Sequence, residues 1–378
     1  MVLEAQTARD FFDTQELQDV RLYINRADWQ KLRQNYLENT YYQCDFQWRD
    51  VVVEGIGIRS RGLGSRNANK PGLRVDFDRY EEGLEFLGLK SFVLDNLVQD
   101  PSLLKERLSM AMFRRVGMAA VRETHARLYV NDEYAGLYLI VESIDKEFLD
   151  RHLGEKNGYL YEYKWNEEYR FEYRGPEPEL YSPNPFKPQT NENNPQPAPL
   201  EAMIRTMNQA SDEQFPDAIR EFLDMNLFLK HVAVEMFLAE LDGILGDFGL
   251  NNFYIYRFNH KNLFQVFPWD KDVTFSAIDR SIWRNADTNV LMRRAMKVPE
   301  FHAIYLDKLL DCADFAGGRG GWLAGEIERM YGQIRQAALE DNRKPLGNEV
   351  FENTVEYLRQ FARERPDLVR AEVSASAQ

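Results

Sequence analysis

Residues 247–272 constrain the fold of this chain more than any other stretch, because two strand patterns there are flanked by polar residues. The runs FYIY (253–256) and LFQVF (263–267) are rich in aromatic and β-branched residues and are separated by a polar turn. This pattern predicts a β-hairpin. Since antiparallel strands return the chain to its starting side, the residues before the first strand and after the second must meet at one end of the hairpin.

Four oxygen-bearing side chains occupy that end: Asp247 and Asn252 come before the hairpin, and Asp270 and Asp272 follow it. Such hard ligands suit Mg²⁺ or Mn²⁺, which bind through one or two carboxylates and substrate phosphates. The order also fits phosphoryl transfer, in which a catalytic Asp is followed by a metal-binding Asn and, after a short hairpin, by a metal-binding Asp. The sequence therefore predicts Asp247 as the catalytic residue and the other three as metal ligands. The alternative is an acidic hairpin end that only caps turns.

A second candidate feature is the segment 62–72, which is rich in Gly, Asn and Ser and lies between two predicted strands. A glycine-rich turn lets backbone N–H groups approach phosphate oxygens closely. Basic residues surround it, so we interpret it as a cradle for a triphosphate; a solvated hairpin tip is the alternative. It is not a P-loop, because GxxxxGK[ST] is absent and a strand follows. The predicted nucleotide-binding residues are Arg61, Ser65, Lys70 and Arg74, with Glu142 at a predicted hinge between lobes.

Strand patterns dominate the first part of the chain and helical periodicity the second, which predicts an α+β fold. We expect two lobes, a β-rich N-terminal lobe with one helix and a mainly helical C-terminal lobe. Nucleotide would bind between them. The expected divisions are a loose N-terminal segment (1–18), the N-terminal lobe (19–143) and the C-terminal lobe (144–378), which contains the catalytic and metal-binding hairpin (247–275).

Two further segments carry specific expectations. Residues 174–199 are dense in Pro and Asn without periodicity, which predicts a surface insertion or mobile loop with no core of its own. Residues 273–283 (VTFSAIDRSIW) are interpreted as the first of several amphipathic helices that follow the hairpin.

Composition excludes several classes of protein. The chain is 44% hydrophobic and 13% aromatic, which suffices for a core, and its formal net charge of −14 argues against a general nucleic-acid binder. No run approaches the roughly 18–20 apolar residues of a membrane span. The N-terminus lacks the basic and apolar regions of a signal peptide, and two cysteines make no disulfide framework. We expect no nucleic-acid partner and no membrane span.

Taken together, these motifs resemble the CotH family, the spore-coat-H-like kinases, whose fold is similar to an atypical protein kinase. The resemblance extends from about Asp19 to beyond Phe275, and PWDxD after the aromatic strand is its most specific part. The segments that carry it are GIGIRSRGLGSRNANKPGLRVDF, LGLKSFVLDNLVQDPSLLKERLSMAMFRRVGM, LYVNDEYAGLYLIVESI, DFGLNNFYIY and FQVFPWDKDVTFS.

The resemblance implies roles for individual residues. Asp247 resembles the catalytic-loop aspartate, Asn252 the metal-binding asparagine, and Asp270 the second metal-binding aspartate, with Asp272 beside it. The segment before Asp247 (LDGILGDFG) departs from the common pattern, so Asp242 competes for the catalytic position.

The function implied is ATP-dependent phosphoryl transfer, with Mg²⁺ or Mn²⁺, to a hydroxyl of a protein substrate, in the first place Ser or Thr. That substrate would be a coat, surface or secreted protein, because family members are often extracytoplasmic or spore-coat associated. One alternative is a pseudokinase-like binding module that recognises such a partner without catalysis. A carboxylate-pair glycoside hydrolase is a weaker alternative, because it gives no reason for the basic glycine-rich segment or for Asn252.

Overall fold

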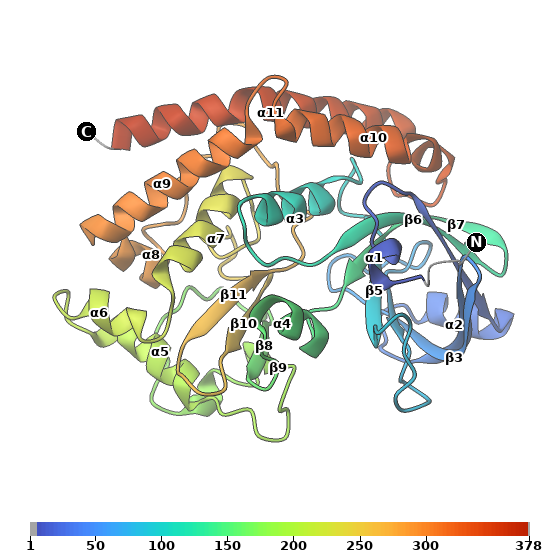
Figure 1. The fold of residues 1–378 in the computed structure, drawn as a ribbon, viewed down its shortest axis with the longest axis horizontal. Helices are drawn as coiled ribbons and strands as arrows, with labels where there is room; N and C mark the ends of the chain where they lie inside the picture. The colour runs from blue at the N-terminus through green and yellow to red at the C-terminus, as the bar shows by residue number, and fades with distance from the viewer. Residues whose placement is uncertain (1–5, 377–378) are drawn as a thin grey trace. The chain divides into compact units, whose positions relative to one another are not determined.

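The computed structural model describes residues 6–376, which divide into two compact units (Figure 1). The barrel unit comprises the chain up to Arg107, Val121–Ser143 and Ile327–Glu356. The helical unit comprises Leu108–Ala120, Ile144–Glu326 and the chain from Tyr357 onward. The chain therefore crosses between the units several times. The expected α+β class is confirmed, since both strands and helices are abundant.

Seven strands of the barrel unit form a closed barrel in the order β1-β2-β3-β4-β5-β7-β6. The barrel was not predicted from the sequence. Neighbouring strands are antiparallel except β1 and β6, whose parallel pairing closes the sheet and leaves no open edge. The strands are β1 (Gln18–Ile24), β2 (Tyr42–Trp48), β3 (Val51–Ser60), β4 (Leu73–Asp76), β5 (Ser91–Asp95), β6 (Glu123–Val130) and β7 (Glu133–Glu142), with helix α2 (Arg26–Gln34) between the first two.

An aromatic cluster fills the barrel and includes a residue from the N-terminal segment. Helix α1 (Ala8–Phe11) places the ring of Phe11, which is fully buried, edge-on against Trp48 and Phe86 at centroid distances of 5.4 and 4.9 Å. Burying such a ring contributes about 1.5–3 kcal/mol. Residues 6–18 thus differ from the loose segment expected from their polar composition, because two aromatic side chains, Phe11 and Phe12, anchor them in the core.

A buried polar group, His125, joins the barrel to the segment that precedes α3 (Lys105–Arg115). Its ring nitrogens lie 2.8 Å from Arg107 Nη1 and 2.7 Å from the carbonyl oxygen of Leu103. Burial, reinforced by the Arg107 charge, lowers the pKa of His125 well below its usual range. The ring is therefore neutral, with one nitrogen accepting from Arg107 and the other donating to Leu103.

This histidine makes the barrel unit sensitive to acid. A depressed folded-state pKa means that stability is present above the ordinary histidine pKa of 6.5 and is lost as pH falls below it, because the unfolded state takes up the proton first. We expect urea unfolding, followed by hydrogen exchange of the barrel strands, to show this loss between neutral and acidic pH. In His125→Gln the slope of the unfolding free energy against pH should decrease by up to about 1.4 kcal/mol per pH unit. An unchanged slope would contradict the assignment, and the exposed His260 provides the control substitution.

The helical unit contains a four-stranded sheet in the order β11-β10-β8-β9, with helix α7 packed against α9 (Figure 1). Its elements are α4 (Lys146–Leu153), β8 (Tyr159–Tyr163), the 3₁₀ turn η1 (Pro178–Leu180), β9 (Phe186–Pro188), α5 (Ala198–Gln209), α6 (Phe215–Arg220), α7 (Met225–Phe237), β10 (Phe253–Arg257), β11 (Phe264–Pro268), α8 (Val290–Ala295) and α9 (Pro299–Ala316). The remaining helices, α3, α10 (Trp322–Glu340) and α11 (Asn348–Ser376), each include residues of both units.

Two segments of this unit differ from expectation. Segment 174–199 contributes β9 to the sheet, and Tyr181 and Phe186 are fully buried, so its aromatic residues give it a share of the core. Residues 273–283 form turns and irregular segments instead of a helix. Phe275 is buried there and its backbone N–H donates to Leu238 O at 2.6 Å, so tertiary contacts take the place of helical ones.

No helix among residues 6–376 combines the length and apolar character needed to cross a membrane.

Candidate active site

The predicted hairpin of β10 and β11 is confirmed, with Phe253 paired to Pro268 at its open end. One step further out, the backbone N–H of Trp269 donates to Asn252 O at 3.2 Å. Asn252 and Asp270 therefore lie at the same end of the hairpin, as the sequence predicts. Both have left-handed backbones, with φ of 55° and 52°, a conformation that Asn and Asp tolerate better than most side chains.

A buried ion-pair network supports this end of the hairpin. Lys271 Nζ donates to Asn252 O at 2.9 Å and to Glu235 Oε1 at 2.7 Å, and His231 Nε2 lies 3.0 Å from the same carboxylate oxygen. Burial alone would raise the pKa of Glu235, but Lys271 and His231 hold it at about 2. Glu235 Oε2 also accepts from the backbone of Ile244 at 2.8 Å. The network thus joins α7, the loop after it and the hairpin end.

Asp242 is the carboxylate that contacts the predicted metal-binding asparagine. Its Oδ2 accepts from Asn251 Nδ2 at 2.9 Å and from Asn252 Nδ2 at 3.1 Å. Its Oδ1 has no hydrogen-bond partner in the part of the chain that the structure describes. Burial raises the pKa of Asp242, so this carboxylate is a stronger proton acceptor than an exposed aspartate.

Asp247 has different surroundings. Its carboxylate accepts from Arg280 Nη2 at 2.8 Å, from Asn285 Nδ2 at 2.9 Å and from Arg284 Nε at 3.2 Å. Hydrogen bonds from Arg280 above all, and then from Asn285 and Arg284, hold the pKa of Asp247 well below its usual range. A carboxylate engaged in this way anchors a loop well, but it is a weak proton acceptor.

The hairpin end carries oxygen-bearing side chains, the ligand type that Mg²⁺ prefers. Asp270 is half-buried and Asp272 buried, one on each side of Lys271. Among residues 6–376, no group of three or more His, Cys, Asp or Glu side chains is arranged to hold a metal. Mg²⁺ commonly uses only one or two protein carboxylates and completes its coordination shell with phosphates and water. Asn252, Asp270 and Asp272 therefore stay predicted metal ligands. In the loop after α7, the buried Oε2 of Glu240 has no hydrogen-bond partner among the described residues, and burial raises the pKa of Glu240 to about 7.

The residues predicted to bind nucleotide lie in the barrel unit, where four of them pair with an oppositely charged neighbour. The Lys70 ammonium is fully buried, 2.7 Å from Asp341 Oδ2. Arg61 Nη1 lies 2.9 Å from Asp95. Glu142, on β7, accepts two hydrogen bonds from the guanidinium of Arg122, at 2.6 and 3.0 Å.

The other two predicted residues are more accessible. The side chain of Arg74 is 37% exposed. Its Nε lies 3.8 Å from Asp76 Oδ2, and its Nη2 donates to Ser91 Oγ at 3.1 Å. Ser65 is half-buried, and its carbonyl oxygen accepts from Asn96 Nδ2 at 2.9 Å. Their roles in nucleotide binding stay predictions.

Comparison with known proteins places the chain in a family. The family model described as CotH kinase protein matches residues 58–369, most of the chain. The chain belongs to this family. The inner spore coat protein H of Bacillus subtilis (strain 168) is 25% identical over 366 residues, which cover 94% of this chain and 97% of that protein. The resemblance predicted from the motifs is therefore confirmed at the level of the CotH family.

Sequence reasoning missed the buried support of this CotH site. Lys271 attracted no role because a lysine between two aspartates suggests a solvated charge, whereas its side chain is fully buried. Glu235 lies on an apolar stretch of α7. A single acidic residue in such a stretch indicates a buried charge that needs a partner, and this was the sequence signal that could have revealed the ion pair.

Proposed function

We propose that this CotH-family chain transfers the γ-phosphoryl group of ATP to a protein hydroxyl, on Ser or Thr, with a divalent metal. One observation carries the proposal: Asp242 contacts Asn252 at the end of the hairpin that also presents Asp270. These are the residue types that phosphoryl transfer needs at one place. Family membership also supports a kinase-like two-lobed fold, and the name of the Bacillus subtilis relative supports a coat or surface protein as substrate.

We assign the proton-accepting role to Asp242 in preference to Asp247, which the sequence ranked first. Oδ2 of Asp242 is fixed by two amides, which leaves Oδ1 for the acceptor hydroxyl. The acceptor oxygen forms a bond to the γ-phosphorus, the bond from that phosphorus to the bridging oxygen of ADP breaks, and the hydroxyl proton goes to Asp242. Asp247 instead holds its loop through Arg280.

Asn252, Asp270 and Asp272 would hold Mg²⁺ or Mn²⁺. The ion would neutralise phosphate charge that develops during transfer. The buried Lys271 positions Asn252, because its hydrogen bond to Asn252 O fixes the backbone that carries the amide side chain.

A non-catalytic, pseudokinase-like binding module is the second candidate. The observation that favours it is the complete burial of Lys70 against Asp341. In this position the Lys70 ammonium does not contact the phosphates of a nucleotide, which is the role that the sequence predicted for it. Such a module would bind a coat or surface partner and would bind nucleotide weakly or not at all.

Metal-dependent nucleotide binding tests the proposal. ATP with Mn²⁺ should raise the melting temperature of the wild type by a few degrees, because binding to the folded state stabilises it. Asp270→Ala should show no rise above its own ligand-free melting temperature. That temperature should lie somewhat below the wild-type value, because Ala tolerates the left-handed backbone of residue 270, with φ of 52°, less well than Asp. An equal rise in the variant would remove Asp270 from the metal site. No rise in the wild type, together with no transfer of label from γ-labelled ATP, would favour the binding module.

A further inference from the structure

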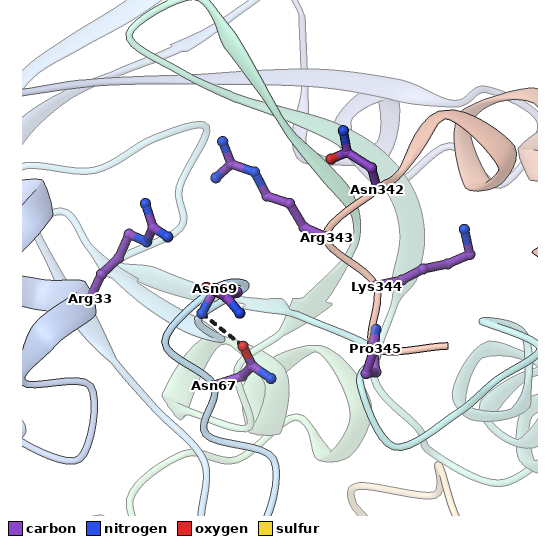
Figure 2. A pocket seen from close by; sticks show the side chains of 7 residues that line it. All are labelled: Arg33, Asn67, Asn69, Asn342, Arg343, Lys344 and Pro345. Atoms are coloured by element: carbon purple, nitrogen blue, oxygen red, sulfur yellow. Dashed lines mark hydrogen bonds between the residues drawn. The ribbon is translucent and has the colours of Figure 1, made fainter. Parts of the chain in front are cut away.

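A basic pocket lies on the barrel unit. It includes Asn67 and Asn69 of segment 62–72, but none of the five residues that the sequence predicts to bind nucleotide lines it. Its volume is about 450 Å³, and its walls come from α2, from segment 62–72 and from the turn after α10 (Figure 2). Three cationic and three carboxamide side chains line it, and no carboxylate does. They are Arg33, Arg343, Lys344, Asn67, Asn69 and Asn342.

Two of these cations are available to a ligand. In Figure 2 the guanidinium groups of Arg33 and Arg343 extend toward the same space from opposite walls. Neither makes an ion pair with a carboxylate among residues 6–376, although Arg33 Nε is oriented by Ala68 O at 2.9 Å. Lys344 differs, because its Nζ donates to the carbonyl oxygens of Ala338 and Asp341 at 2.9 and 3.0 Å.

The pocket walls are held in place before any ligand arrives. Lys70 follows Asn69 in the sequence, and Asp341 precedes Asn342. These two residues form the buried ion pair of 2.7 Å, which joins the segments that carry the two asparagines. Asn67 Oδ1 accepts from the backbone N–H groups of Asn69 and Lys70 at 2.8 and 3.0 Å, which fixes the tip of segment 62–72. Asp341 Oδ1 accepts from the backbone of Arg343 at 3.0 Å. A rigid wall on each side reduces the entropy lost on binding.

We propose that this pocket binds a phosphate-bearing ligand. Two guanidinium groups facing one space present the paired donors that match phosphate oxygens, and carboxamides add neutral donors. The pocket gathers positive charge in a chain whose net charge is −14, so the local residues, and not the overall field, must supply the attraction. The phosphate would be carried by a small molecule or by a phosphoserine of a protein. The proposal does not depend on the phosphoryl transfer proposed above.

Isothermal titration with two probes, inorganic pyrophosphate and a phosphoserine peptide, tests the site. We expect wild-type protein to bind at least one probe, and Arg33→Gln and Arg343→Gln each to weaken binding about tenfold or more, the loss of one charge-assisted contact. Binding should weaken as ionic strength rises. If the protein binds pyrophosphate but not the peptide, the pocket is a site for free phosphates. If it binds the peptide more tightly than pyrophosphate, the pocket is a site for a phosphoprotein.

Two controls make the result specific. Arg26, on the same helix as Arg33, is exposed and does not line the pocket, so Arg26→Gln should bind like the wild type. Asp270→Ala should also retain pyrophosphate binding, which separates the pocket from the proposed metal site. The proposal is overturned if neither probe binds, if Arg26→Gln loses as much affinity as the pocket variants, or if Asp270→Ala abolishes binding. Because Arg33 and Arg343 are half-buried at the surface, unchanged melting temperatures should show that the variants fold.

Discussion

Replacing Asp242 with asparagine is expected to lower phosphoryl transfer on the order of a thousandfold, the usual contribution of a positioned proton acceptor. The substitution keeps the size of the side chain and its ability to accept from the amides of Asn251 and Asn252. It removes only the negative charge and the proton affinity. We therefore expect ATP binding with Mn²⁺ to change far less than the rate, measured with γ-labelled ATP and a casein-like acceptor.

Asp247→Asn is the matched comparison, because it makes the same chemical change five residues later. Here we expect most of the rate to remain and the stability to fall by about 1–3 kcal/mol, because Arg280, whose side chain is 9% exposed, would lose its charged partner. Urea unfolding and the same transfer assay separate the two effects. If the rate collapsed in Asp247→Asn and survived in Asp242→Asn, the original sequence ranking would be restored and our assignment would fail.

The difference between these two aspartates shows how far the sequence can be taken. The hairpin and the meeting of its flanks were predictable, because strand periodicity and antiparallel geometry are local properties. The hydrogen-bond partners of each carboxylate, and so its pKa, were not predictable. The protonation behaviour of Asp247 depends on Arg280 and Arg284, which follow it by 33 and 37 residues. Arg280 lies in segment 273–283, which the sequence predicts as helix. Spacing alone favoured Asp247, whereas the tertiary partners favour Asp242.

The barrel shows the same limit on a larger scale. Strand patterns were visible in the sequence, but closure of the barrel requires β1 to pair in parallel with β6, more than a hundred residues away, and no short sequence pattern indicates that pairing. Likewise, Lys70 looked like a phosphate ligand because its neighbours in sequence are basic and glycine-rich. Its actual partner, Asp341, is separated from it by 271 residues.

Removing that partner is expected to give the largest loss of stability. Asp341→Ala should lower the unfolding free energy of the barrel unit by about 3–5 kcal/mol, the cost of leaving a fully buried ammonium without its counter-charge. Asp341 also accepts from the backbone of Leu137 at 3.1 Å, and a Cβ added at Gly136 would lie 2.8 Å from the carboxylate, so the strand is built closely around this group. Hydrogen exchange of the barrel strands in increasing urea would measure the loss.

The exposed pair Lys31–Asp28 supplies the control, because Asp28→Ala should change stability by less than about 1 kcal/mol. A double variant, Lys70→Met with Asp341→Leu, tests the cause. If the penalty of Asp341→Ala comes from an unpaired buried charge, removing both charges should recover part of the stability, since replacing a buried pair by apolar residues is often nearly neutral. The backbone groups that Asp341 satisfies would still lose their acceptor, so recovery should be incomplete. A double variant no more stable than Asp341→Ala would show that those backbone contacts, and not the charge of Lys70, dominate at this position.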